Sequence, residues 1–261
     1  MTNLRIFLIG GLISYRALFS WLRPAIFIPT FLVGPLFQIA LFVYLGRGAH
    51  LESDSFYVIG NGLEYAALPC LFAMGQTIAN ERRTHTLPLI IASPAARLPL
   101  FLGRSLPVIA NGFVVSAFAL VASALMFGVS IPRAAVPGIA LAVLVISMSC
   151  TGLGLVNAAL ALRVRETAVL SNVIFGLLLV FCGVNIPLGL LPSWMAATAG
   201  YLPLTHGIAA AREMAAGRTF SAVAGLLGME LLVGAAYLVG GMLLLAVFEA
   251  ESRRRATLDR S

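Results

Sequence analysis

Apolar residues fill six long stretches of the chain, and short polar segments separate them. The stretches cover residues 24–46, 56–80, 105–127, 135–162, 167–187 and 221–248. A helix needs about 20 apolar residues to cross the hydrocarbon core of a membrane, and each stretch meets this length. The pattern therefore predicts an all-α polytopic membrane protein with six transmembrane helices in a single domain, residues 1–261. Within the first stretch, we expect Pro29 and Pro35 to kink the helix or press it against its neighbours.

The first 23 residues carry an apolar run, Ile6–Ile13, that is too short to cross a membrane. On a helix, Arg5, Arg16 and Arg23 fall within roughly 20° of one another. We therefore expect residues 1–23 to form a helix that lies in the cytoplasmic interface, with its Arg side chains at the lipid headgroups. The alternative is that these residues extend the first transmembrane helix.

The segment of residues 81–104, ERRTHTLPLIIASPAARLPLFLGR, is a long interruption that combines charge with a helical pattern. Ser93 and Pro94 form a good helix start, because Ser caps a helix and Pro suits its first position. We therefore expect a short helix that ends near Ala92 and a second helix that leads into the third transmembrane helix. Pro88 restarts or bends the first of these helices.

The distribution of arginine predicts the orientation. With both termini in the cytoplasm, thirteen of the 17 arginines lie on the inner side. The outer side then holds Arg47, Arg133, Arg212 and Arg218. Cytoplasmic loops carry an excess of basic residues, so we place the 81–104 segment and the basic tail 249–261 inside. The short polar loop 47–55 and the long, semi-polar connection 188–220 are then outside.

Composition excludes several classes of function. Hydrophobic residues make up 60% of the chain and charged residues only 10%, whereas soluble domains carry about a quarter charged residues. The net charge of +7 comes from arginines that flank apolar stretches, so a nucleic-acid interface is not expected. The chain has no lysine, so it lacks the residue that a P-loop uses to reach the phosphates of ATP.

Catalysis by this chain alone is not expected either. Asp54 and Asp259 are the only aspartates, which leaves little material for a hydrolytic triad. The three histidines are isolated, and the three cysteines are far apart in apolar sequence, so no metal site or disulfide framework is predicted. Any energy for work must come from another protein.

Polar residues inside the apolar stretches can be interpreted in more than one way. Glu64 and Glu230 are either carboxylates near the outer membrane interface, which we favour, or parts of a proton or cation relay. Asn157 and Asn172 are expected to form hydrogen bonds between helices. Small residues in the last stretch predict close helix packing or a subunit interface; they are Gly225, Gly228, Gly234, Gly240 and Gly241.

Two stretches resemble a known family. The run FYVIGNGLEYAALPCLFAMGQTIANERRTHTLPLIIASPAARLPLFLGRSL is similar to the second span and following cytoplasmic segment of type-2 ATP-binding-cassette (ABC) exporter permeases. The matching positions are Glu81, Arg82, Thr86, Leu87, Ser93, Pro94, Gly103 and Arg104. The chain departs from the pattern at His85, Pro88 and Asn61, where Gly, Glu and Pro are usual.

The second stretch, SNVIFGLLLVFCGVNIPLGLLPSWMAATAGYLPLTHGIAAAREMAAG, resembles the fifth span and outer re-entrant segment of the same family. The matching positions are Asn172, Gly183, Pro187, Leu191, Pro192, Trp194, Pro203, Leu204, Thr205 and Arg212, and His206 replaces a common Tyr. The two stretches and the six-span layout cover nearly the whole chain.

The resemblance implies roles for three sets of residues. A cytoplasmic coupling helix would dock on the ATPase through Glu81, Arg82, Arg83, Thr86, Leu87, Leu89 and Ile90. An outer re-entrant gate would contain Pro187, Pro192, Trp194, Pro203, Leu204, Thr205, His206 and Arg212. Polar positions of the path or of an interface would be Glu64, Asn157, Asn172 and Glu230.

The resemblance also implies a function. The chain would be the permease subunit of an ATP-driven exporter in the plasma membrane of a prokaryote, moving a hydrophobic or amphipathic drug or antibiotic. Its partners would be two copies of a cytoplasmic ABC ATPase, which hold the ATP and Mg, and a second permease copy or a related permease. The chain itself would bind no cofactor. Export of a lipid-linked glycan or peptide is the alternative within the class, and a proton-coupled secondary carrier is the alternative from another class.

Overall fold

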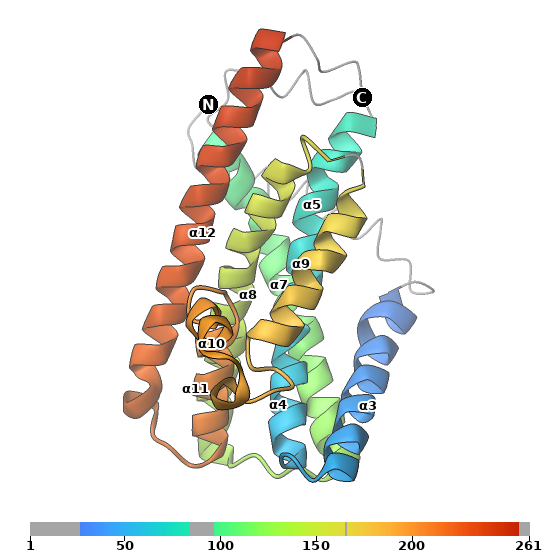
Figure 1. The fold of residues 1–261 in the computed structure, drawn as a ribbon, viewed down its shortest axis with the longest axis vertical. Coiled ribbons are helices and arrows are strands. Elements are labelled where there is room, and N and C mark those ends of the chain that lie inside the picture. The colour runs from blue at the N-terminus through green and yellow to red at the C-terminus, as the bar shows by residue number, and fades with distance from the viewer. Residues whose placement is uncertain (1–26, 84–96, 165, 256–261) are drawn as a thin grey trace.

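The computed structural model describes residues 27–83, 97–164 and 166–255, and every regular element in these ranges is a helix (Figure 1). The expected interfacial helix 1–23 lies outside the described residues. In chain order the elements are η1 (Ile28–Val33), α3 (Gly34–Ala49), α4 (Asp54–Glu64), α5 (Ala67–Arg83), α7 (Arg97–Phe127), η2 (Arg133–Ala135), α8 (Val136–Leu160), α9 (Thr167–Phe181), η3 (Leu188–Leu190), α10 (Ser193–Ala199), α11 (Thr205–Ala215) and α12 (Phe220–Arg255).

Five helical segments of the described chain are long and apolar enough to cross a membrane. They are Ile28–Ala49, Asp54–Gln76, Gly103–Phe127, Arg133–Leu160 and Phe220–Phe248. These segments correspond to five of the six expected spans, with boundaries that differ by a few residues. The remaining one, the fifth expected span, residues 167–187, contains only the 15-residue helix α9. Helix α9 ends at Phe181 because the chain turns at Gly183, which has a left-handed φ of 72°.

The first span begins with the expected distortion at proline. Residues Ile28–Val33 form a π-helical turn, η1, in which Gly34 donates its backbone N–H to the carbonyl of Pro29. Proline lacks a backbone N–H, and insertions of this kind are a common response of helices to such a gap. The helix then continues as α3 to Ala49, three residues beyond the expected end at residue 46.

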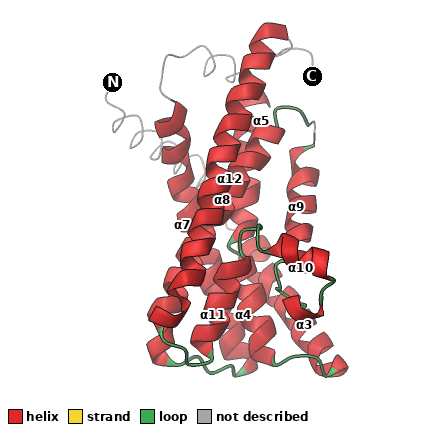
Figure 2. Cartoon of the chain, turned by 60° about the vertical axis from the view of Figure 1, so that its left-hand side comes forward, coloured by secondary structure: helices red, strands yellow, loops and turns green. Residues whose placement is uncertain are grey.

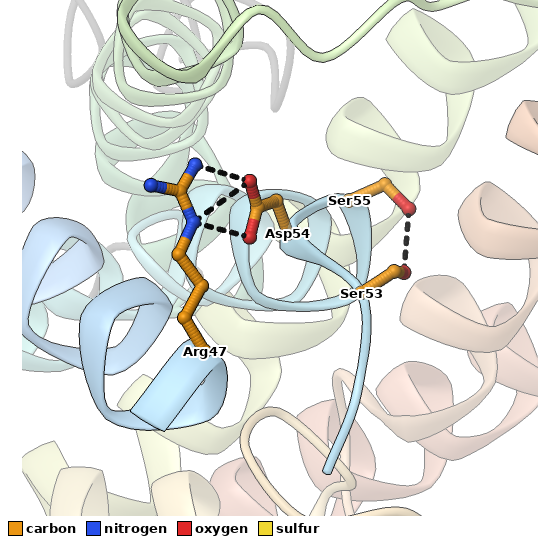
Figure 3. A network of polar contacts seen from close by, with 4 residues as sticks. All are labelled: Arg47, Ser53, Asp54 and Ser55. Atoms are coloured by element: carbon orange, nitrogen blue, oxygen red, sulfur yellow. Dashed lines mark hydrogen bonds and ion pairs between the residues drawn. The ribbon is translucent and has the colours of Figure 1, made fainter. Parts of the chain in front are cut away.

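The loop between α3 and α4 is shorter than expected, because an ion pair closes it. Arg47 of α3 binds the carboxylate of Asp54, the first residue of α4, with an Nη2 to Oδ2 distance of 2.5 Å (Figure 3). The Arg47 guanidinium also lies 5.5 Å from the ring centroid of Tyr44 and 5.7 Å from that of Phe127. Residues that the pattern assigned to a polar loop, 47–55, therefore end one helix and begin the next.

The second span is broken in the middle, although a continuous helix was predicted over residues 56–80. Helix α4 ends at Glu64 and α5 begins at Ala67. The break lies one turn before Pro69, and a proline clashes with the carbonyl of the residue four positions earlier, here Tyr65. Glu64 is the last residue before the break.

Helix α8 lies at the centre of the bundle and packs against α5, α7, α11 and α12. Its contact with α12 is close because both helices carry glycines there. A Cβ atom on Gly234 of α12 would lie 2.6 Å from the Cα of Ser149, and one on Gly241 would lie 2.9 Å from the backbone N of Val156. The close packing expected for the last span is therefore found at Gly234 and Gly241. Nothing lies within 4 Å of a Cβ on Gly225, Gly228 or Gly240.

Several connections lie at the two ends of the bundle, and the loops around α10 lie between these ends (Figure 2). Residues 50–53, 128–132 and 216–219 link helices at one end, and residues 161–164 follow α8 at the other. At this second end Arg163 pairs with Glu251, and its guanidinium lies 4.6 Å from the ring centroid of Phe248. These contacts join the ends of α8 and α12, and α12 continues as a helix to Arg255, into the expected tail.

Candidate functional site

The expected coupling residues lie at the edge of the described chain. Glu81, Arg82 and Arg83 form the end of helix α5. The other expected coupling positions, Thr86, Leu87, Leu89 and Ile90, lie outside the described residues, as do Ser93 and Pro94. The described geometry of the candidate site therefore concerns the connection between α9 and α12 and the buried polar residues.

The connection between α9 and α12 folds into two short helices. Pro187 and Pro192 each precede a short helix, η3 and α10, as its N-cap residue. The chain then turns at residues 200–204 into α11. Helix α10 has 7 residues and α11 has 11, so neither is long enough to cross a membrane. Helix α10 packs against α9, and α11 packs against α4, α8 and α12 (Figure 1).

Helix α10 is the exposed part of this connection. Trp194 is 65% exposed, and its ring lies edge-on to Phe181 at the end of α9, with 6.0 Å between the ring centroids. Nε2 of His206 hydrogen-bonds with the carbonyl oxygen of Gly200 at 2.9 Å, which ties the start of α11 to the end of α10. An exposed indole next to an apolar helix is typical of a side chain at a membrane–water interface.

Helix α11 is held at its first turn by a carboxylate from α12. Glu230 is 0% exposed, and its two oxygens accept the backbone N–H groups of Leu204 at 2.7 Å and Gly207 at 3.0 Å. Leu204 is the N-cap of α11 and has a φ of 88°, which is unusual for a residue with a side chain. Just before it, the carbonyl of Pro203 accepts a hydrogen bond from the thiol of Cys182 at 3.4 Å. The carboxylate therefore satisfies backbone donors that a helix start leaves without partners.

Near the other end of α11, Arg212 joins three segments. Nη1 donates to the carbonyl of Gly183 at 2.7 Å, and Nη2 donates to the carbonyls of Val184 and Phe56, both at 2.9 Å. The guanidinium lies 3.5 Å from the centroid of the Phe56 ring. A Cβ on Gly60 would lie 2.5 Å from the Val184 carbonyl oxygen, so glycine allows α4 to approach this turn. Burial lowers the pKa of Arg212 to about 10, so the side chain remains a cation at neutral pH.

A second set of polar residues forms what we call the α3–α4 cluster: Gln38, Asn61, Glu64, Tyr65 and Asn185. Nε2 of Gln38 donates to Oε2 of Glu64 at 3.1 Å and approaches Oδ1 of Asn61 at 3.4 Å. The Tyr65 hydroxyl donates to Oε1 of Gln38 at 2.8 Å, and Nδ2 of Asn61 donates to Oδ1 of Asn185 at 2.7 Å. The cluster connects α3, the end of α4 and the turn after α9.

The two asparagines expected to link helices behave differently. Nδ2 of Asn157 on α8 donates to the carbonyl of Leu71 on α5 at 3.0 Å and to the hydroxyl of Ser171 on α9 at 2.8 Å. Asn157 therefore joins three helices, as predicted. Asn172 is exposed, and its side chain donates to the carbonyl of Ala168 in the preceding turn of α9. Within the described chain, Asn172 makes a local contact.

Comparison with known families decides the class of the protein. The model of the ABC-2 type transporter family matches residues 10–215, which is most of the chain. The chain belongs to this family. No curated protein gives a match. The type-2 ABC permease resemblance is thereby confirmed, and the chain is a multi-pass membrane subunit of an ABC transporter.

In this ABC-2 transporter subunit the expected gate residues fall into two groups. Leu204 and Thr205 are buried at the start of α11, and Arg212 is tied into the bundle at three carbonyls. Trp194 and the two prolines Pro187 and Pro192 belong to the more exposed part around η3 and α10. The sequence analysis had placed Glu230 among the polar residues of the path or of an interface. In the structure it contacts the first of these two groups, at the backbone N–H of Leu204.

Both buried carboxylates of the ABC-2 subunit belong to apolar segments. Glu64 is the eleventh residue of the 23-residue apolar segment Asp54–Gln76, so it lies near the middle of this segment. The expectation that both carboxylates lie near the outer membrane interface stays a prediction. Glu230 is the eleventh residue of the 29-residue segment Phe220–Phe248, several turns from its start. Both side chains are 0% exposed.

Sequence reasoning missed three members of the α3–α4 cluster: Gln38, Tyr65 and Asn185. Gln38 and Asn185 contact a residue that was under consideration, Glu64 or Asn61, and Tyr65 contacts Gln38. One signal was present for the first of them. Gln38 is the single amide side chain in the apolar stretch 24–46, and a lone amide in a membrane helix usually has a polar partner.

Proposed function

We propose that this ABC-2 subunit is the permease of an ATP-driven exporter, which moves a hydrophobic or amphipathic small molecule, such as a drug or antibiotic, out of a prokaryotic cell. The observation that carries the proposal is the family match over residues 10–215 on a helical membrane bundle. The chain contains no lysine and hence no P-loop of the usual kind, so a separate ABC ATPase supplies the energy.

The ATPase docks on the segment between α5 and α7, at the cytoplasmic end of the bundle. This segment, residues 81–104, begins with the Glu81–Arg82–Arg83 cluster at the end of α5 and leads into α7. Helices α5 and α7 pack against each other, and both pack against the central helix α8. A displacement of the segment by a closing ATPase dimer therefore moves two packed helices and reaches the core of the permease.

Two permeases, either two copies of this chain or this chain and a related one, enclose the path. Both flanks of the described bundle carry exposed apolar side chains, on α3 at Phe37 and Leu41 and on α9 at Val173 and Leu177. Lipid or a second permease covers such faces in a membrane. Helices α10 and α11 close the outer end of the path, and Arg212 and Glu230 hold α11 in place.

The substrate is amphipathic because the described bundle combines apolar faces with the buried polar α3–α4 cluster. The outer loops that link α3 to α4 and α7 to α8 are short. They offer little surface for binding a large molecule outside the cell, so a small molecule is favoured as the substrate. A lipid-linked glycan or a peptide is the alternative cargo. Both termini lie in the cytoplasm on the arginine count, and the ATPase partner binds from that side.

Co-purification from the native membrane in a mild detergent tests the proposal. We expect a soluble ABC ATPase to be recovered with the permease in equal amounts. ATP should then drive substrate uptake into inverted vesicles that contain the complex, even when a protonophore has removed the proton gradient. Transport that the protonophore abolishes while ATP is present would favour the proton-coupled carrier. Failure to recover any ATPase would reject the exporter.

A further inference from the structure

Glu64 is a buried carboxylate with one oxygen that has no partner. It is 0% exposed, and it lies near the middle of the apolar segment Asp54–Gln76. Oε2 accepts a hydrogen bond from Nε2 of Gln38 at 3.1 Å, whereas Oε1 has no hydrogen-bond partner. The other buried carboxylate, Glu230, accepts backbone N–H groups with both of its oxygens. Glu64 therefore has unused acceptor capacity that Glu230 does not have.

No cation stands beside Glu64 in the described part of the chain. The ion pairs there join Arg47 to Asp54, Arg163 to Glu251 and Arg218 to Glu213. Arg212 is bound to three backbone carbonyls. An ionised carboxylate in an apolar interior is costly unless a cation and hydrogen bonds accompany it. A cationic group that reaches Glu64 thus gains far more there than it would at an exposed carboxylate.

The surroundings of Glu64 suit an organic cation. Tyr65 follows Glu64 in the chain, and the centroid of the Tyr65 ring lies 6.4 Å from the centroid of the Phe175 ring on α9. Aromatic faces attract ammonium groups, most strongly where water is excluded. A hard metal ion prefers six or more oxygen ligands, and the cluster offers a single carboxylate, so an inorganic divalent cation fits less well.

Gln38 covers the carboxylate on the side of α3. Its side chain is held by Glu64 and Tyr65, and the residue is partly exposed at the flank of the bundle. Both of these hydrogen bonds belong to one amide on a side chain with rotatable bonds, so a single side chain holds Oε2 of Glu64 on this side. Helix α3 contacts α4 and α7 and leaves this flank without another helix of the described chain.

We propose that Glu64 recognises a cationic group on the exported molecule, with Gln38 as its movable cover. The substrates are then amphipathic cations, an apolar body that carries an ammonium or similar group. This inference rests on the proposed export function and adds to it the charge of the substrate. A neutral or anionic amphiphile gains nothing from Glu64.

Direct binding tests the inference without the ATPase. The probe is tetraphenylphosphonium, a permanently charged lipophilic cation, and tetraphenylborate is an anion of the same shape. The full chain is reconstituted in lipid nanodiscs, and binding is measured by equilibrium dialysis against empty discs. We expect saturable binding of the cation alone. Glu64→Gln should weaken it at least tenfold, which corresponds to about 1.4 kcal/mol, and Glu64→Asp should retain most of it.

Two further variants guard against trivial explanations. Glu52→Gln removes an exposed carboxylate in the loop between α3 and α4, and it should bind the cation as the unchanged chain does. Gln38→Ala removes the cover and should speed association of the cation while Glu64 is intact. Thermal unfolding of each variant in the same discs confirms that it is folded.

The outcomes separate this inference from the proposed function. Equal cation binding by the unchanged chain and Glu64→Gln would overturn the role of Glu64, and so would equal binding of the anion. If the cation fails to bind while an ATPase co-purifies and ATP-driven transport is present, the exporter stands and the cationic substrate class is wrong. If Glu64-dependent binding is found without any ATPase partner, the recognition of cations stands and the exporter fails.

Discussion

The carboxylate of Glu230 on α12 accepts the backbone N–H of Leu204 at 2.7 Å, 26 residues earlier in the chain. Leu204 has a left-handed φ of 88°, a conformation that persists in a leucine only where the surroundings stabilise it. The second oxygen of Glu230 accepts the N–H of Gly207 at 3.0 Å. One side chain of the last span thus stabilises the first turn of α11 and the strained residue before it.

Replacing Glu230 should therefore loosen α11 before it affects the rest of the bundle. Glu230→Leu leaves two buried N–H groups without an acceptor, at a cost of about 1–3 kcal/mol each. Glu230→Gln keeps one acceptor oxygen and should have an intermediate effect. Thermal unfolding in detergent gives the loss of stability, and hydrogen exchange of residues 204–208 localises it. Met229→Leu, at an exposed neighbouring position, is the control. Unchanged exchange at residues 204–208 in Glu230→Leu would contradict the role of the carboxylate.

Arg212 should stabilise the connection between α9 and α12 more than Arg218 does. Arg212→Met leaves the carbonyls of Gly183, Val184 and Phe56 without this donor, and we expect a loss on the order of 3 kcal/mol. Arg212→Lys keeps the charge, but a lysine ammonium lacks the planar guanidinium that reaches all three carbonyls. This variant should therefore be more stable than Arg212→Met and less stable than the unchanged protein. The measurement is chemical or thermal unfolding in detergent.

The matched control for Arg212 is Arg218→Met. Arg218 lies six residues further along and forms an exposed ion pair with Glu213 at 3.2 Å. Exposed ion pairs contribute at most about 1 kcal/mol, so this variant should unfold close to the unchanged protein. Equal destabilisation by Arg212→Met and Arg218→Met would show that the three carbonyl contacts do not stabilise the connection between α9 and α12.

Substitution by alanine should change the stability of the protein differently at two glycines of α12, Gly234 and Gly240. A Cβ at Gly234 would lie 2.6 Å from the Cα of Ser149 on α8, so Gly234→Ala must push the two helices apart, at about 1–3 kcal/mol. Nothing lies within 4 Å of a Cβ at Gly240, and Ala favours a helix over Gly by up to about 1 kcal/mol. Gly240→Ala should therefore leave stability unchanged or raise it. Thermal unfolding of the two variants compares them directly, and a destabilised Gly240→Ala would place that face in a contact between subunits.

The spans could be predicted because they depend on local composition. A run of about 20 apolar residues is a property of the nearby sequence, and five such runs are found as helices. The length of α9 could not be read in this way. The apolar run 167–187 continues past Phe181, but the left-handed turn at Gly183 is stabilised by Arg212, 29 residues away. A contact over that distance leaves no periodic signal in the sequence.

The partners of the buried carboxylates were also beyond a reading of the sequence. Glu64 lies at the end of α4, next to a break before α5 that the apolar pattern does not show. Its partner Gln38 is 26 residues away on another helix. By contrast, Asn157 joins helices as expected. Asn172 was expected to do the same, but its side chain donates to the carbonyl of Ala168 in its own helix. A polar partner for each amide was predictable, but the identity of the partner was not.

The coupling segment gives the last prediction, which rests on the proposal that the ATPase transmits its movement at the end of α5. Glu81→Ala or Arg82→Glu should leave membrane insertion intact, since these residues follow the apolar segment Asp54–Gln76. Substrate-stimulated ATPase turnover of the reconstituted complex should fall at least about fivefold, the lower end of typical coupling energies of 1–3 kcal/mol.

Arg133→Gln, at the opposite end of the bundle, changes one charge without touching this segment and should keep full stimulation. Unchanged stimulation in Arg82→Glu would remove this cluster from the docking surface. If Glu81→Ala abolishes basal and stimulated turnover together, the residue is needed for ATPase binding, and the loss lies in assembly rather than in transmission.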